Sequence, residues 1–188
     1  MRFRPIFNKN KPRQQRIFLS GEHTLYFFKM KELEKLLKRY SQYDTSERGI
    51  NGIPYNICGS IPEFSGNRLV PFIISHYMDQ NSNCIYPKQF LTICGILSPD
   101  TLALVKKEFL FEMFDENNIG VLKHGEMFSL YKIIFGESIS DNIILDLTFR
   151  ALNHTELEKP GEIRKDEFMK MIPDNEIMSK LSVNLQLT

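Results

Sequence analysis

The chain has 188 residues, a formal net charge of +1 at pH 7, 42% hydrophobic residues and 25% charged residues. The small net charge gives no electrostatic argument for a nucleic-acid partner, and no apolar run approaches the roughly 20 residues of a membrane span. Cys58, Cys84 and Cys94 form no CxxC pair, which excludes a disulfide framework and favours a reducing compartment. We therefore expect a cytoplasmic globular protein in which each cysteine is a small buried hydrophobe.

Residues 1–16 carry six arginines or lysines and no acid. Such a composition is typical of a transit peptide, but Pro5 and Pro12 interrupt any amphipathic helix there. We favour a basic arm that lies on a partner, and a solvated tail is the alternative. Because Arg2 follows Met1, N-myristoylation, which requires glycine at that position, is not expected.

Apolar residues then recur at three- and four-residue spacing in a series of segments, which predicts amphipathic helices. These segments are 31–43, 67–78, 87–97, 98–114, 125–136, 141–152 and 163–172. Ser98 with Pro99 predicts a helix start, Gly136 predicts a helix end, and Ser140 predicts the cap of the next helix.

Polar breaks near residues 44–53, 78–86, 115–126 and 156–167 divide the helices into four helix–loop–helix units that recur about every 35–40 residues. Ile53, Ile85, Leu122 and Ile163 lie at the hydrophobic point of each break, where paired loops could bridge. We therefore predict an all-α protein with strands of only one or two residues per loop.

The third break matches the sequence pattern of a calcium loop. Such a loop needs oxygens at its first, third and fifth positions, a backbone carbonyl at the seventh and a glutamate at the twelfth. Asp115, Asn117, Val121 and Glu126 stand at the first, third, seventh and twelfth positions, and they are our candidate metal ligands. Ile119 at the fifth position supplies no ligand, so a loop retained only for its geometry is an equal alternative to calcium binding.

The other three breaks match the pattern less well. The fourth, "ELEKPGEIRKDE", begins with Glu156 and has Pro160 at the fifth position, which leaves at most an irregular site. The first, from Asp44, is about two residues too long, and the second begins with Met78 and ends in Gln89. We expect calcium in neither of the first two.

Four such units resemble an EF-hand protein of the calcineurin B and calcineurin B homologous protein group, over roughly residues 30 to 185. The segments "SIPEFSGNRLV" and "FLFEMFDENNIGVLKHGEMFSLYKIIFG" are similar to that family's linker and third hand, and "IPDNEIMSKLSVNL" resembles its final segment. The chain departs from the family in all four loops. The resemblance implies two EF-hand lobes with short β-bridges: residues 1–29 as the basic arm, 30–97 as a degenerate N-terminal pair, and 98–188 as the C-terminal pair and tail.

The resemblance also implies a non-catalytic subunit that buries an amphipathic helix of a partner protein in a hydrophobic groove. The abundance of Phe and Met suits such an adaptable surface, although ordinary core packing explains most of these residues. The candidate groove residues are Phe109, Met113, Phe114, Met127, Phe128, Phe135, Phe168 and Met171.

No catalytic set is recognisable, because the four histidines are scattered and the chain has no HExxH motif and no phosphate-binding loop. We therefore expect an adaptor or regulatory subunit with weak or no calcium dependence, no nucleic-acid partner and no membrane span. One alternative is a calcium sensor that acts through the third loop. Another is a structural component of a cytoskeletal or ciliary assembly.

Overall fold

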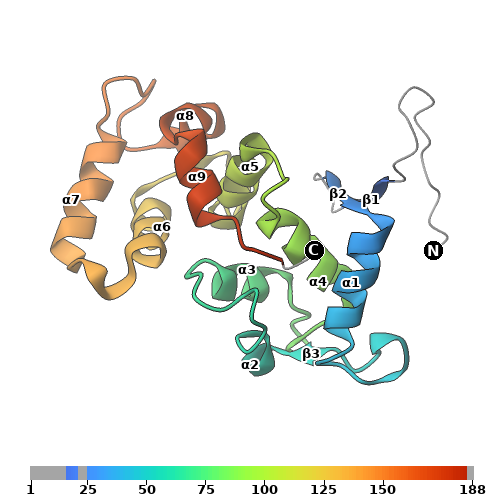
Figure 1. The fold of residues 1–188 in the computed structure, drawn as a ribbon. Helices are drawn as coiled ribbons and strands as arrows, with labels where there is room; N and C mark the ends of the chain where they lie inside the picture. The colour runs from blue at the N-terminus through green and yellow to red at the C-terminus, as the bar shows by residue number, and fades with distance from the viewer. Residues whose placement is uncertain (1–15, 21–24, 186–188) are drawn as a thin grey trace, which may run out of the picture. The chain divides into compact units, whose positions relative to one another are not determined.

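The computed structural model describes residues 16–20 and 25–185, and helices dominate it (Figure 1). The prediction of an all-α protein with short β-bridges is confirmed. The helices are α1 (Met30–Tyr40), α2 (Tyr55–Cys58), α3 (Val70–Tyr77), α4 (Pro87–Leu97), α5 (Ala103–Phe114), α6 (His124–Phe135), α7 (Asp141–Leu152), α8 (Lys165–Met171) and α9 (Asp174–Lys180), with 3-10 turns at Glu47–Gly49 and Gly136–Ser138.

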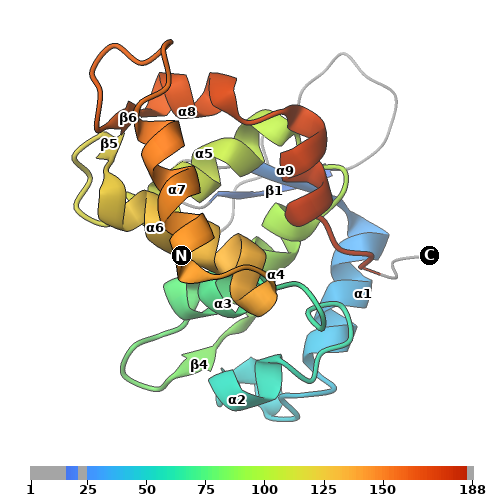
Figure 2. The same ribbon diagram turned by 90° about the vertical axis from the view of Figure 1, so that its left-hand side faces the viewer.

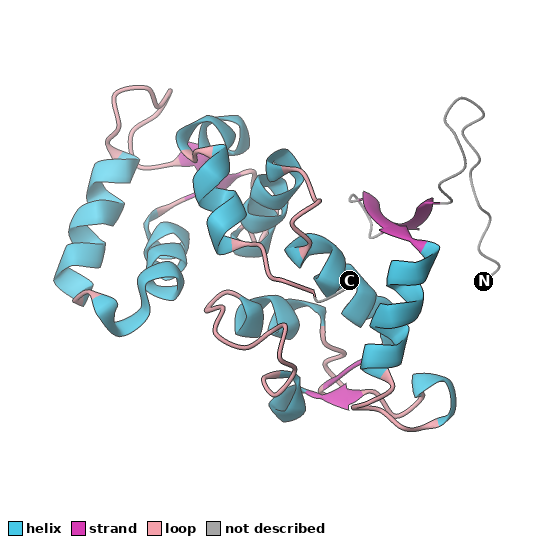
Figure 3. Cartoon of the chain, viewed as in Figure 1, coloured by secondary structure: helices cyan, strands magenta, loops and turns pink. Residues whose placement is uncertain are grey.

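The four loops pair two by two, as the sequence predicts. Strand β3 (Ile53–Pro54) pairs antiparallel with β4 (Cys84–Ile85), and β5 (Val121–Leu122) pairs with β6 (Ile163–Arg164). Figure 3 shows how short these strands are. Ile53 lies opposite Ile85 and Leu122 opposite Ile163, and all four side chains are buried, so the hydrophobic point of each loop forms the bridge.

The prediction of an extended arm up to residue 29 is wrong for the part of it that the structure describes. Strand β1 (Arg16–Ser20) pairs antiparallel with β2 (Leu25–Lys29), in the register Ile17 to Phe28 and Leu19 to Tyr26. Both segments are rich in aliphatic and aromatic residues, which favour strands. Strand β2 lies against α1 and α4, where Phe28 is buried. The predicted basic arm before Arg16 lies outside the described residues.

The described residues form two compact units. Unit 1 contains the residues up to Ser65, Tyr77–Thr101 and the residues from Val183, and unit 2 contains Gly66–His76 and Leu102–Ser182. The boundaries therefore differ from the division after residue 97 that we expected. Residues 66–76 belong to unit 2 partly because Asn67 Nδ2 donates to the carbonyl of Lys180 at 2.9 Å and Arg68 donates to the carbonyl of Phe135.

Aromatic packing organises the core of unit 1. The ring of Phe90 on α4 lies 5.4 Å from the ring of Tyr40 on α1, edge to face, and 5.7 Å from that of Phe64. The hydroxyl of Tyr40 lies 3.0 Å from the carbonyl of Ile85, which connects α1 to the paired loops. Cys58 and Cys94 are also buried there and free, as expected for small hydrophobes.

In unit 2, helices α6 and α7 lie side by side in both views (Figures 1 and 2). Leu130 of α6 and Ile144 of α7 are buried, and the ring of Phe111 on α5 lies 5.4 Å from that of Phe168 on α8. Unit 2 thus has its own apolar core, built from the last two helix–loop–helix units.

The helix ends around α6 and α7 agree with the sequence prediction, whereas the start of α5 does not. Gly136 follows α6 with φ +56°, a conformation that favours glycine, and Ser140 caps α7. Ser98 was expected to begin a helix, but α5 begins at Ala103. The Ser98 hydroxyl accepts a hydrogen bond from the amide of Asp100 at 3.2 Å, and Thr101 Oγ1 donates to the carbonyl of Gly95 at 2.6 Å. These bonds stabilise a turn in place of the first helical turn.

Two adjacent lysines of α5 hold the C-terminal helices. Lys107 Nζ lies 2.6 Å from Asp174 Oδ1 at the start of α9 and donates to the carbonyl of Met169 at 3.1 Å. Lys106, fully buried, donates to the carbonyl of Leu181. In residues 16–20 and 25–185, none of the helices has the length and apolar character that a membrane crossing requires.

Candidate functional site

Each of the first three loops contains an aspartate that accepts hydrogen bonds from the loop itself. Asp44 Oδ2 accepts from the amide of Gly52 at 2.8 Å, and its Oδ1 accepts from the hydroxyl of Ser46 at 2.6 Å. Asp79, one residue beyond the expected start at Met78, accepts from the amide of Ser82 at 2.8 Å. The first two loops, poor in metal ligands, are therefore held by hydrogen bonds within the chain.

Asp115 acts in the same way in the third loop. Its Oδ1 accepts from the amide of Ile119 at 2.9 Å, and its Oδ2 accepts from the amide of Gly120 at 2.8 Å. The side chain is buried, and Gly120 has φ +78°, which turns its amide towards the carboxylate. The carboxylate therefore stabilises the turn of the loop with both of its oxygens.

The twelfth positions cap the helices that leave the loops. The acceptor on this side chain bonds the amide three residues earlier, which is one half of a capping box. The bonds join Gln89 Oε1 to the amide of Tyr86 at 2.7 Å, Glu126 Oε2 to the amide of Lys123 at 2.9 Å, and Glu167 Oε2 to the amide of Arg164 at 2.8 Å. Positions that coordinate calcium in a complete loop thus have a purely structural use here.

A cavity of about 480 Å³ lies in unit 2 beside the third loop. Helix α3, the last turn of α5, the loop and the first half of α6 line it. Its apolar wall includes Phe72, Met113, Phe114, Ile119 and Ile133. The size falls in the range of pockets that hold a ligand or a large side chain, about 300–1,000 Å³.

The four predicted metal ligands all line this cavity. Asp115, Asn117, Val121 and Glu126 are brought together by the turn of the third loop. One oxygen each from the first three and two from Glu126 make five at most, whereas calcium takes six to eight. Across the part of the chain that the structure describes, no three His, Cys, Asp or Glu side chains converge as a metal site would require. The donor set is therefore incomplete without added water.

The predicted groove residues divide into three groups. Met113 and Phe114 line the cavity. Phe109, Met127 and Phe168 are buried in unit 2, so they contribute to its core. The remaining three, Phe128, Phe135 and Met171, are partly exposed.

Sequence reasoning missed the most exposed apolar side chains of unit 2. Phe72 on α3 is 47% exposed, and on α7 Ile143, Leu145 and Phe149 are 49%, 41% and 65% exposed. The segment "DNIILDLTFRAL" carries apolar residues around more than one helical face, which was an available signal. A helix in this pattern cannot bury all of its apolar side chains against one neighbour.

Comparison with known proteins gives a consistent set of relatives, although no family model matches the chain. It is 25% identical over 158 residues to calcineurin B of Naegleria gruberi, which covers 84% of this chain and 88% of that protein. It is 28% identical over 156 residues to calcineurin B of Candida glabrata, covering 83% and 88%. It is 29% identical over 158 residues to calcineurin B type 1 of Dictyostelium discoideum, covering 84% and 87%.

Proposed function

We propose that this chain, which is a calcineurin B-like EF-hand protein, is a non-catalytic regulatory subunit that binds an amphipathic helix of a partner protein. The binding has little or no calcium dependence. The relatives are themselves named as subunits of calcineurin, and the similarity extends over most of both chains.

The observation that carries this proposal is the cavity of unit 2. An amphipathic helix binds such proteins by inserting large apolar side chains into a groove. Phe72, Met113 and Ile133 offer an apolar wall from three different helices, α3, α5 and α6. A cavity of about 480 Å³ has room for one such anchoring side chain.

Helix α7 supplies a second apolar surface. Ile143, Leu145 and Phe149 are exposed on it, and large apolar groups at a protein surface mark interaction sites when they are clustered. Asp146 and Arg150 form an ion pair of 2.8 Å on the same helix, so charged groups border the apolar ones. This mixture of an apolar centre and a charged rim is typical of a protein interface.

The weak calcium dependence is supported by the hydrogen bonds of the third loop. Asp115 already accepts two backbone amides, and Ile119 offers no oxygen at the fifth position. The loop is therefore closed without an ion, and calcium has little additional order to supply.

A calcium sensor that acts through the third loop is the second candidate, because the four predicted ligands surround one cavity. Calorimetry with calcium on the wild type and on Glu126→Gln separates the two functions. Micromolar binding that the substitution abolishes favours the sensor, and the absence of such binding favours the adaptor. The cytoskeletal or ciliary alternative receives no support from these three relatives, which are all calcineurin subunits.

The adaptor function is tested with a fluorescently labelled peptide that contains the helix by which a calcineurin catalytic subunit binds calcineurin B. We expect saturable binding to the full chain, and weaker binding to Phe72→Ser. Ile50→Ser is the matched control, because Ile50 is 70% exposed in unit 1, away from the cavity residues. A wild-type chain that does not bind the peptide, or equal loss in both variants, contradicts the proposal.

A further inference from the structure

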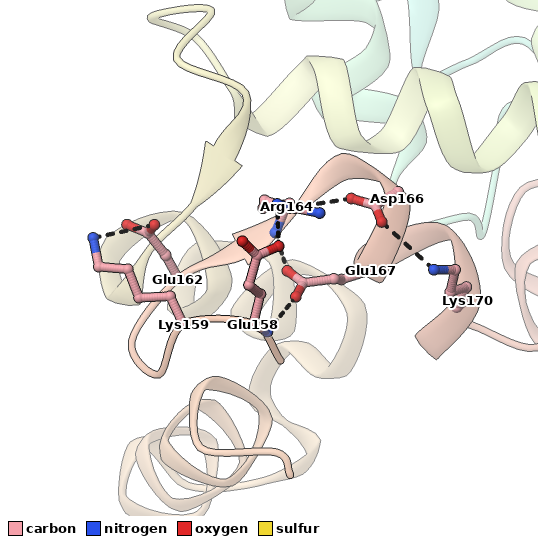
Figure 4. Close-up of polar contacts among 7 residues, drawn as sticks. All are labelled: Glu158, Lys159, Glu162, Arg164, Asp166, Glu167 and Lys170. Carbon is pink, nitrogen blue, oxygen red and sulfur yellow. Dashed lines mark hydrogen bonds and ion pairs between the residues drawn. The ribbon is translucent and has the colours of Figure 1, made fainter. Parts of the chain in front are cut away.

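The fourth loop, between α7 and α8, carries a cation of its own. Arg164 at its ninth position forms ion pairs with Glu158 and with Asp166, and its Nε lies 3.3 Å from Asp166 Oδ1 (Figure 4). Both carboxylates belong to the same twelve-residue loop. Arg164 therefore joins the third position of the loop to the eleventh.

Glu167 closes the same loop from the opposite direction. Its Oε1 accepts from the amide of Glu158 at 2.6 Å, and its Oε2 accepts from the amide of Arg164 at 2.8 Å. These two amides lower the pKa of Glu167, so the carboxylate is ionised. Glu158, Arg164 and Glu167 thus form a closed ring of contacts, in which each residue touches the other two (Figure 4).

Two more ion pairs engage other acids of this segment. Lys159 Nζ lies 3.3 Å from Glu162 Oε1, and Lys170 Nζ lies 3.5 Å from Asp166 Oδ2. A metal ion that entered the loop would have to displace Arg164 from Glu158 and Asp166 and the amides from Glu167. It would also approach a fixed positive charge, which weakens its binding.

We infer that Arg164 is the built-in cation of the fourth loop and that it replaces calcium as the group that holds the loop closed. The guanidinium is planar and can bridge two carboxylates at once, which a single ammonium group does less well. Arg164 also lies in β6, where it pairs with Val121 of the third loop. The closed fourth loop therefore keeps the third loop in its paired position at any calcium concentration.

This role depends on the network and not on one ion pair. Arg164, Glu158 and Asp166 are all substantially exposed, and exposed ion pairs are individually weak and are screened by salt. The buried carboxylate of Glu167 adds two hydrogen bonds that salt does not screen in this way. The network deepens the proposed calcium independence, and it is testable without any partner.

The test compares Arg164→Gln with Lys170→Gln. Both variants remove one positive charge and one ion pair to Asp166, but only the first breaks the bridge to Glu158. The measurement is the backbone amide spectrum of ¹⁵N-labelled protein during a calcium titration, followed at Gly161, the sixth position of the loop. We expect no saturable shift of the Gly161 signal in the wild type or in Lys170→Gln, and a saturable shift in Arg164→Gln, with apparent affinity at least about tenfold above the wild type.

A saturable shift of Gly161 in the wild type, or the same response in Arg164→Gln as in the wild type, overturns the inference. If Arg164→Gln does not fold, Arg164→Lys retains the charge without the planar bridge, and we expect it to respond to calcium between the wild type and a restored loop. A calcium response of Arg164→Lys identical to that of the wild type then contradicts the role of the bridge. No peptide takes part, so failure of the helix-binding proposal would leave this result unaffected.

Discussion

The carboxylate of Asp115 accepts the backbone amide of Gly120 at 2.8 Å, so the first and sixth positions of the third loop are joined within the chain. In a loop that depends on calcium, the ion supplies much of this order. Here the aspartate stabilises the turn directly, and the consequences can be measured.

Asp115→Ala is expected to destabilise the protein in the absence of calcium. The substitution removes the acceptor for the amides of Ile119 and Gly120, and leaving such groups unpaired costs about 1–3 kcal/mol. Urea denaturation in the presence of a chelator measures the change. Asn117→Ala, at an exposed position of the same loop, is the control, and equal stability of Asp115→Ala and the wild type would show that the aspartate has no structural role.

Ile119→Asp is expected to strengthen calcium binding at the third loop. It supplies the missing oxygen at the fifth position, and Ile119 is 53% exposed, so no core contact is lost. Calorimetry should show an affinity at least about tenfold above that of the wild type. Ile50→Asp, at an exposed apolar position outside the third loop, should leave calcium binding unchanged. An unchanged affinity in Ile119→Asp would show that the missing ligand is not what limits binding.

Lys106→Met is expected to change how stability depends on pH. Burial lowers the pKa of Lys106 from 10.5 to about 8. Between about pH 8 and 10.5 the unfolded chain binds more protons at this site than the folded protein, so this contribution to stability rises with pH. Below that window both states are protonated, and the full cost of burying the charge remains.

The measurement is the free energy of unfolding of the wild type minus that of Lys106→Met, at several pH values. Other titrating groups largely cancel in this difference. The difference should rise in favour of the wild type across the window, with a slope of at most about 1.4 kcal/mol per pH unit. A flat or falling difference contradicts the burial of an ionisable amine at this position.

Phe149→Ser is expected to weaken binding of the calcineurin catalytic-subunit helix by at least about fivefold, the size of effect that a central interface residue produces. Phe149 is 65% exposed, so the free energy of unfolding should change by no more than about 0.5 kcal/mol. Fluorescence anisotropy and urea denaturation measure the two quantities. An unchanged affinity would exclude α7 from the interface.

The paired loops could be predicted from the sequence because their physics is local. Ile53, Ile85, Leu122 and Ile163 each stand as an apolar residue in a polar break, and a buried bridge is the arrangement that shields all four. Gly136 could be predicted for a similar reason, because glycine is favoured where a helix ends in a positive φ.

Other features depend on contacts that a local pattern does not contain. The start of α5 at Ala103 depends on the bond from Thr101 to Gly95, which spans six residues. The division of the apolar residues depends on which neighbours cover them, so Phe168 is buried and Phe149 is exposed although both lie in amphipathic patterns. The role of Arg164 depends on the fold of a loop whose sequence only shows missing ligands.

The central claim is that a partner helix binds to a scaffold that the chain itself holds in shape. The most direct test is the dissociation constant of the calcineurin catalytic-subunit helix, measured by anisotropy once with saturating calcium and once with chelator. We predict two values within about twofold of each other. Binding that is more than about tenfold tighter in calcium, or no binding under either condition, would contradict the claim.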